Sequence, residues 1–126
     1  MYLDTSAVGR VLLGEPGHEK VLAAFAEFNQ HVSSQLMRVE LSRLGLRHGV
    51  LAGARSLAAS VAMVPLSESV LALAETITPE EVASLDAIHL ATAVTLSDGG
   101  EVGAMMTYDR ALADGARSHR LEVISP

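Results

Sequence analysis

Four carboxylate residues are spaced along the chain so that folding could bring them together: Asp4, Glu40, Asp86 and Asp109. Asp4 directly follows the apolar segment 1–3, and Asp109 follows an apolar segment that ends at Thr107. Polar groups that follow parallel strands lie at one edge of a sheet, where α/β proteins bind ligands. The spacing therefore predicts that Asp4 and Asp109 face one crevice. The alternative is that Asp4 only caps a helix and Asp109 only occupies a turn.

Glu40 lies in an apolar stripe of its predicted helix, because Leu36 and Leu44 stand four residues before and after it. A carboxylate that faces a core costs roughly several kcal/mol unless a cation, an arginine or a proton compensates its charge. Its position thus favours a functional partner. The alternatives are a salt bridge to Arg43 or Arg47, or a place at the edge of the stripe.

Asp86 repeats this pattern near the start of the most apolar predicted helix, with Val82 and Leu90 four residues to either side. The alternative is that Asp86 only stabilises the first turn through the helix dipole, an effect of about 0.3–1 kcal/mol. That explanation suffices for one acid and is weaker for four acids in one small domain.

Carboxylates that converge within a few ångströms repel one another and need cations to remain ionised together. Oxygen ligands suit a hard octahedral ion such as Mg²⁺, with Mn²⁺ as the alternative, whereas zinc prefers histidine and cysteine. The chain has no cysteine. One or two such ions can lower the pKa of a water, orient it for in-line attack on a phosphodiester and stabilise the leaving oxygen. The acids therefore indicate metal-dependent hydrolysis.

Short apolar segments that alternate with helical ones must position these acids. Such alternation is typical of parallel strands joined by right-handed crossovers. We therefore expect a three-layer α/β/α sandwich with a mainly parallel central sheet, in one domain over residues 1–126. Strands are expected at 1–3, 31–34, 62–66 (buried), 102–107 and 121–124; helices are expected from residue 5 and at 18–28, 36–47, 51–60, 67–77, 84–96 and 110–118.

The composition fits this fold, because 49% of the 126 residues are apolar and few are aromatic. Neither a secretory signal nor an uninterrupted apolar span of membrane length is evident, so we expect a cytoplasmic protein without a membrane partner. The net charge of −6 argues against a nucleic-acid ligand. However, eight of the nine basic residues are arginine, the side chain best suited to phosphate contact.

Four segments together resemble PIN-domain ribonucleases, and specifically the VapC-like toxins of type II toxin–antitoxin systems. They are LDTSA at 3–7, VEL at 39–41, LDAIHLATA at 85–93 and TYDRAL at 107–112, in the family's order. The resemblance implies that Asp4, Glu40, Asp86 and Asp109 are the metal-binding and catalytic acids, with Ser6 and Thr107 orienting ligands or water. It also implies an RNA substrate, a homodimer and a VapB-like antitoxin.

Other residues carry weaker expectations. His89 could touch RNA, although a lone histidine on an Ala-rich helix is more often packed and hydrogen-bonded. Arg110 adjoins Asp109 and is a candidate RNA contact. Arg38, Arg43, Arg47 and Arg55 are weaker candidates, while Asp98 and Asp114 are expected to be solvated.

Two other acid-pocket folds fit less well. A receiver domain needs paired acids after its first strand and a lysine after a late strand, but the only lysine is Lys20. A phosphatase of the haloacid-dehalogenase type needs a second aspartate where Ser6 stands. The remaining alternative is a non-catalytic PIN-like module that acts only by binding a protein.

Overall fold

The computed structural model describes residues 1–126 and contains one sheet of five short strands. The strands lie in the order β3-β2-β1-β4-β5 and every neighbouring pair is parallel. Tyr2 is in register with Val32 of β2 and with Met105 of β4, so β1 occupies the middle of the sheet. The strands are β1 (Tyr2–Leu3), β2 (Val32–Ser34), β3 (Ala62–Val64), β4 (Ala104–Met106) and β5 (Glu122–Ile124).

Seven helices connect and flank these strands. Several begin at a polar residue whose side chain accepts a hydrogen bond from a backbone N–H of the first turn. Asp4, Ser34, Ser67 and Asp109 cap their helices in this way. The helices are α1 (Thr5–Leu12), α2 (His18–Ala26), α3 (Gln35–Arg47), α4 (Leu51–Ala59), α5 (Glu68–Thr76), α6 (Ser84–Asp98) and α7 (Arg110–Ser118).

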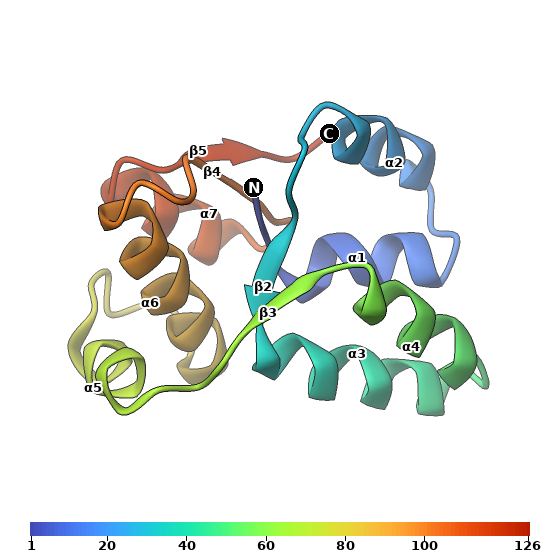
Figure 1. Cartoon of the computed structure of the whole chain (residues 1–126), viewed down its shortest axis with the longest axis horizontal. Helices are drawn as coiled ribbons and strands as arrows, with labels where there is room; N and C mark the ends of the chain where they lie inside the picture. Colours follow the sequence, from blue (N-terminus) through green and yellow to red (C-terminus); the bar gives the residue numbers. More distant parts are fainter.

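The helices form two layers, with α1 to α4 on one side of the strands and α5, α6 and α7 on the other (Figure 1). Side chains alternate between the faces of a strand, and the sheet serves both layers accordingly. Tyr2 and Met105 belong to the core with α5 to α7, whereas Leu3 and Met106 belong to the core with α1 to α4. The structure is therefore the expected three-layer α/β/α sandwich.

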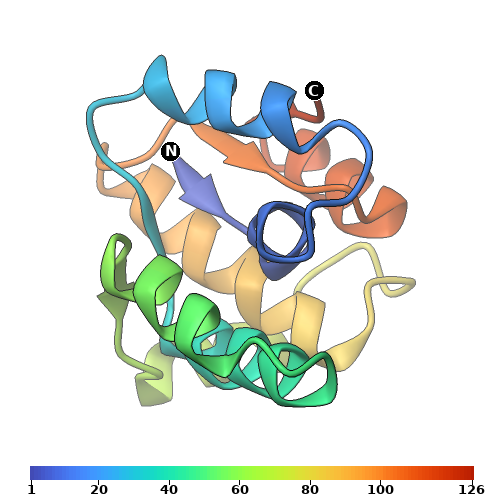
Figure 2. The same cartoon turned by 90° about the vertical axis from the view of Figure 1, so that its right-hand side faces the viewer.

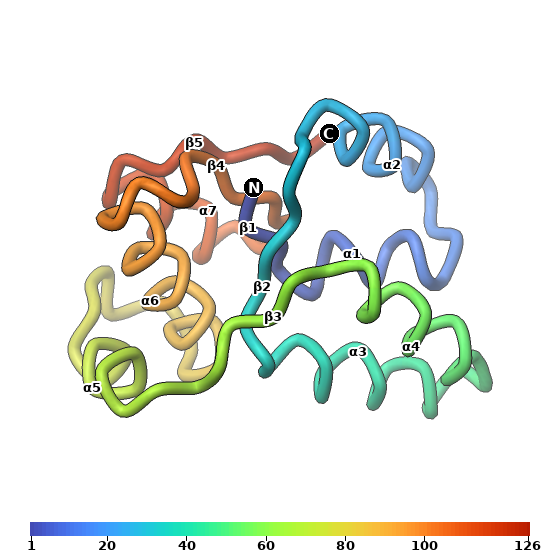
Figure 3. Tube along the Cα trace, viewed as in Figure 1, coloured from blue at the N-terminus to red at the C-terminus, as the bar shows by residue number.

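The chain builds the sheet outward in both directions from β1, its central strand. It runs from β1 outward to β2 and β3, then returns to the other side of β1 to form β4 and β5. Figure 2 shows β1 beside β4, with α1 leading directly out of β1. The trace in Figure 3 shows the N-terminus in the interior of the molecule. This reversal of strand order next to β1 creates the crevice in which α/β sheets bind ligands.

The expected order of strands and helices is confirmed, with boundaries that differ by a few residues. One expectation is wrong: the strand at 62–66 is not buried. β3 lies at the edge of the sheet, where Ala62 is exposed and Met63 and Val64 are half-buried. An edge strand has a neighbour on one side only, so its apolar residues remain partly open to solvent. No helix has the length and apolar character needed to cross a bilayer.

Candidate functional site

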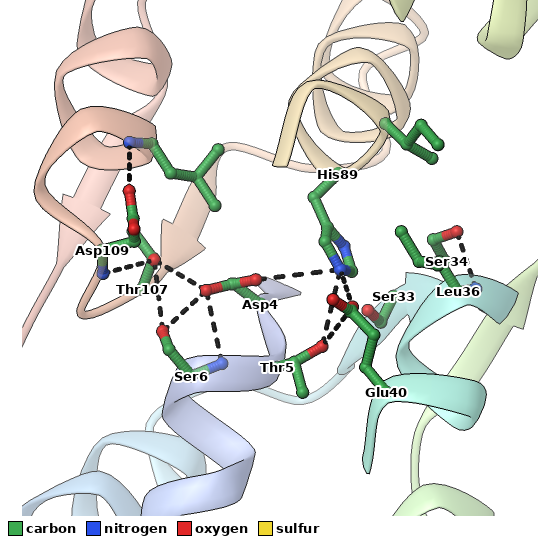
Figure 4. Close-up of polar contacts among 12 residues, drawn as sticks. Asp4, Thr5, Ser6, Ser33, Ser34, Leu36, Glu40, His89, Thr107 and Asp109 are labelled. Carbon is green, nitrogen blue, oxygen red and sulfur yellow. Dashed lines mark hydrogen bonds and ion pairs between the residues drawn. The ribbon is translucent and has the colours of Figure 1, made fainter. Parts of the chain in front are cut away.

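Asp4 is the centre of the site because it follows the central strand. It is only 3% exposed, and its backbone N–H donates to the carbonyl of Met106 at 3.0 Å, which continues the pairing of β1 with β4. Figure 4 shows Asp4 between two groups of polar side chains. Ser6, Thr107 and Asp109 lie on one side, and His89, Glu40 and Thr5 lie on the other.

One carboxylate oxygen of Asp4 is held by hydroxyl groups. Its Oδ2 accepts hydrogen bonds from Ser6 Oγ at 2.6 Å and from Thr107 Oγ1 at 2.9 Å. It also accepts the cap bond from the Ser6 N–H at 3.3 Å. The structure thus places Ser6 and Thr107 where they orient Asp4. The cap interpretation of Asp4 is also correct, but all of these bonds fall on Oδ2 and leave Oδ1 for other partners.

Asp109 joins the same group through Thr107. Its backbone N–H donates to Thr107 Oγ1 at 3.0 Å, and its Oδ1 accepts from the Leu112 N–H at 2.8 Å to cap α7. Asp109 therefore caps a helix, whereas the alternative drawn from the sequence gave it only a place in a turn. A cap uses one carboxylate oxygen, so Oδ2 of Asp109 is not committed to the backbone.

Glu40 is held from the other side of Asp4 by His89. The Nε2 of His89 lies 2.6 Å from Glu40 Oε1 and 3.8 Å from Asp4 Oδ1. Thr5 Oγ1 donates to the same Glu40 oxygen at 2.8 Å. The alternative of a salt bridge from Glu40 to Arg43 or Arg47 is wrong, because neither arginine forms an ion pair.

These donors control the charge of Glu40. Burial by itself would raise the pKa of this half-buried carboxyl. The hydrogen bonds from His89 and Thr5, and the nearby charge of His89 when it is protonated, outweigh burial and bring the pKa of Glu40 below its ordinary value. Glu40 is therefore ionised without any added cation.

Asp86 lies in the first turn of α6, three residues before His89. Burial and then the negative charges of Asp4 and Asp109 raise the pKa of Asp86 to about 6, and Glu40 adds to the effect. A helix N-terminus would lower the pKa of an acid, so the stabilising first-turn interaction is outweighed here. Because the pKa of Asp86 is raised instead, Asp86 shares its surroundings with the other three acids.

The arrangement meets part of what a hard cation requires. All four acids offer oxygen ligands, and the mutual repulsion that raises the pKa of Asp86 would be relieved by a positive ion. However, no three acidic or histidine side chains are close enough to one another to form a ready-made metal centre. The residues present fit a divalent ion in chemistry, and binding requires some of these carboxylates to turn toward it.

Four of the five candidate arginines lie in two places, and the fifth, Arg47, is exposed at the end of α3. Arg38, Arg43 and Arg55 are exposed and line a hollow of about 870 Å³ between α3, α4 and β3. Val39, 60% exposed, borders the same hollow. Arg110 is exposed at the start of α7, next to Asp109. The sequence suggested these arginines individually, but their convergence on one hollow depends on the packing of α4 against α3.

Two further side chains, His89 and Tyr2, lie beside the acids. His89 is completely buried, which agrees with the expectation of a packed and hydrogen-bonded histidine. In this conformation it cannot contact RNA directly. Tyr2 was not singled out from the sequence, yet its hydroxyl lies 2.7 Å from His89 Nδ1. A tyrosine in an apolar opening strand is indistinguishable from a core residue until its distant partner is known.

Comparison with known proteins identifies relatives along the whole chain. Residues 1–118 match the family described as the PIN domain. Ribonuclease VapC47 of Mycobacterium tuberculosis is 38% identical over 133 residues, covering 100% of this chain and 96% of that protein. Ribonuclease VapC46 of the same species is 36% identical over 129 residues, covering 100% of this chain and 97% of its own length. Ribonuclease VapC35 is 30% identical, with 100% and 96% coverage.

Proposed function

The chain belongs to the PIN-domain family, and on this basis we propose that it is a magnesium-dependent endoribonuclease, the toxin of a VapBC-type toxin–antitoxin pair. The observation that carries the proposal is the gathering of four acids around one end of the sheet. These acids are Asp4, Glu40, Asp86 and Asp109, which lie up to 105 residues apart in the sequence. The chain that carries them is similar along its whole length to ribonucleases named VapC.

In this proposal the four acids hold one or two Mg²⁺ ions, for which Mn²⁺ can substitute. A bound ion supplies Lewis-acid chemistry, because it lowers the pKa of a water and neutralises charge on the phosphodiester. The residues of the chain prepare the site for it. Ser6 and Thr107 donate to Asp4 Oδ2 and so fix the orientation of this carboxylate in a position that is 3% exposed.

The remaining acids have different tasks. Glu40 is ionised in advance by its donors and offers a fixed negative charge. Asp86 has a pKa of about 6 in the cation-free protein, so it is partly protonated around pH 6, where a bound cation would favour its ionised form. Arg110, exposed beside Asp109, is proposed as a phosphate contact that orients the RNA backbone.

The proposed partners follow from the same assignment. The substrate is RNA, the regulatory partner is a VapB-like antitoxin, and the toxin acts in the cytoplasm as a homodimer built from one domain per chain. The similarity to VapC ribonucleases supports the first two partners. Size-exclusion chromatography with light scattering on the isolated chain tests the dimer.

RNA cleavage by the parent chain and by Asp4→Asn, each with and without Mg²⁺, tests the proposed activity. Asp98→Asn is the matched control, because Asp98 is an exposed aspartate at the end of α6. We expect cleavage by the parent and by Asp98→Asn only with the cation. Asp4→Asn should lose cleavage by roughly a hundredfold or more, or about 3 kcal/mol in activation free energy.

A different result would favour the protein-binding alternative. If the parent cuts no RNA with Mg²⁺ or Mn²⁺ but binds an antitoxin, the chain is a non-catalytic PIN-like module. Sequencing of 5′ ends after induced expression would identify the RNA and the cleavage position.

A further inference from the structure

A continuous series of buried hydrogen bonds connects Glu40 to the middle of the sheet. The Ser34 N–H donates to the Tyr2 hydroxyl at 3.2 Å, and that hydroxyl lies 2.7 Å from His89 Nδ1. The other ring nitrogen of His89 lies 2.6 Å from Glu40 Oε1. Tyr2, Ser34 and His89 are all fully buried. No solvent-exposed group interrupts this series before it reaches the half-buried Glu40.

When the His89 ring is neutral, the chemistry of the groups fixes the direction of every bond. An ionised carboxylate can only accept, so His89 Nε2 must carry a proton. In the neutral ring Nδ1 is then an acceptor, so the Tyr2 hydroxyl donates to it and uses its own lone pair for the Ser34 N–H. Burial raises the pKa of Tyr2, which keeps its proton available as a donor. The opposite tautomer would place an unprotonated nitrogen against the carboxylate.

The series also determines which oxygen of Glu40 remains available. Both donors, His89 and Thr5, bind Oε1, while Oε2 has no hydrogen bond to the protein. Ser34 caps α3, the helix that carries Glu40, so Tyr2 ties the start of this helix to the histidine. Glu40 is thus held in two ways: through the start of the helix that carries it and through one of its carboxylate oxygens.

On the basis of the proposed function, we infer that Tyr2 and His89 are positioning residues that hold Glu40 Oε1 and present Oε2 to the divalent cation. His89 touches the acid directly, and Tyr2 fixes the tautomer of His89 from the other side of the ring. Outer partners of metal ligands generally orient them in this way, and their loss reduces metal affinity or activity by about 10- to 100-fold. Neither side chain contacts RNA.

Tyr2→Phe tests the inference most cleanly, because it removes one hydroxyl and leaves the ring in the core. Tyr108→Phe is the matched control, since it removes the hydroxyl of the chain's other tyrosine, which binds the carbonyl of Pro126. Nitrogen NMR of the His89 ring in the cation-free protein should show the proton on Nε2 and Nδ1 as the hydrogen-bond acceptor. The Nδ1 resonance should move in Tyr2→Phe and stay in place in Tyr108→Phe.

Mg²⁺ affinity by calorimetry provides a second readout. Tyr2→Phe should weaken it by about three- to tenfold, the effect of one neutral hydrogen bond. For RNA cleavage, kcat should fall by a similar factor with KM for RNA unchanged. A ring protonated on Nδ1 in the parent protein, or a Mg²⁺ affinity of Tyr2→Phe within about twofold of the parent, would overturn the inference.

A second pair of variants separates positioning from packing. His89→Gln keeps an N–H donor that can reach Glu40, whereas His89→Leu fills similar space without one. We expect His89→Gln to retain most of the Mg²⁺ affinity, and His89→Leu to lose about 10- to 100-fold. Equal loss in both folded variants would show that only packing matters. If these affinities behave as expected but the parent cuts no RNA, the proposed function fails and the positioning role stands.

Discussion

Glu40 on α3 and Asp86 on α6 belong to the same group of acids but come from opposite helix layers, and their pKa values shift in opposite directions. Both carboxyls are half-buried, so burial alone does not explain the difference. Glu40 receives two hydrogen bonds on one oxygen. Asp86 has no hydrogen-bond donor from the protein, and its nearest charged neighbours are mainly other acids.

The comparison shows that the neighbours of each acid decide its charge in the cation-free protein. Glu40 is compensated by groups that the fold supplies permanently. Asp86 is left with a repulsion that only a proton or a cation relieves. We therefore expect a cation to change the state of Asp86 more than that of Glu40.

The largest expected effect is on RNA cleavage. Asp86→Asn and Glu40→Gln should each reduce kcat by roughly a hundredfold or more at saturating Mg²⁺, because each removes one charge that the ion needs. Asp114→Asn is the control, since Asp114 is exposed and pairs only with Arg117 at 3.2 Å. Gel-based cleavage of a fixed RNA measures the rates. Full activity in Asp86→Asn would remove this residue from the site.

The next effect is on stability without a cation, where the two substitutions should act in opposite directions. The step from an ordinary pKa of 3.8 to about 6 corresponds to about 3 kcal/mol for Asp86. Solvent screening of a half-buried group reduces this to about 1–2 kcal/mol. Asp86→Asn should therefore raise the free energy of unfolding at pH 7 by about 1–2 kcal/mol. Glu40→Gln should lower it by about 1 kcal/mol, because His89 loses a charged acceptor.

The same comparison has a defined pH dependence. The pKa of Asp86 is raised in the folded state, so its destabilising contribution is absent below about pH 4, grows up to about pH 6 and is complete above it. Glu40 has a lowered pKa and behaves oppositely, because its stabilising contribution is present above its ordinary value of 4.5 and is lost as the pH falls. Urea unfolding in EDTA between about pH 3 and pH 8 covers both windows. Parallel pH curves for the parent and Asp86→Asn would contradict the assignment.

The smallest effect is a proton released on cation binding. With a pKa of about 6, Asp86 is half protonated at pH 6, so Mg²⁺ binding should release about half a proton there and almost none at pH 8. Calorimetry in buffers with different ionisation enthalpies counts the released protons. Release should disappear in Asp86→Asn and persist in Glu40→Gln, which distinguishes the two acids once more.

Local patterns in the sequence were sufficient to predict the order of the elements. Short apolar segments followed by Asp4, Ser34 or Asp109 indicate a strand and then a capped helix, and these signals depend only on nearby residues. The predicted proximity of the four acids follows from their places after strands or on apolar helix faces. The burial of 62–66 was wrong because an apolar run does not reveal whether its strand lies at the edge of a sheet.

Partners distant in the sequence could not be predicted. Glu40 meets His89 49 residues later, and Tyr2 meets it across 87 residues. Nothing near Tyr2 distinguishes it from an ordinary core tyrosine. For Glu40, nearby arginines suggested local salt bridges, but Arg43 and Arg47 are exposed and the helix turns the acid toward α6 instead. Contacts of this kind depend on how the layers pack and carry no local sequence signal.

The central position of β1 has a consequence for synthesis of the chain. Asp4 is among the first residues made, but Thr107, which holds its carboxylate, and Asp109 are added only after 103 and 105 further residues, respectively. A chain that ends before β4 has a first strand without one of its two neighbours, and it lacks Asp109, one of the four acids. Under the proposed function, such an unfinished copy is expected to be inactive, so activity would appear only once the chain is nearly complete.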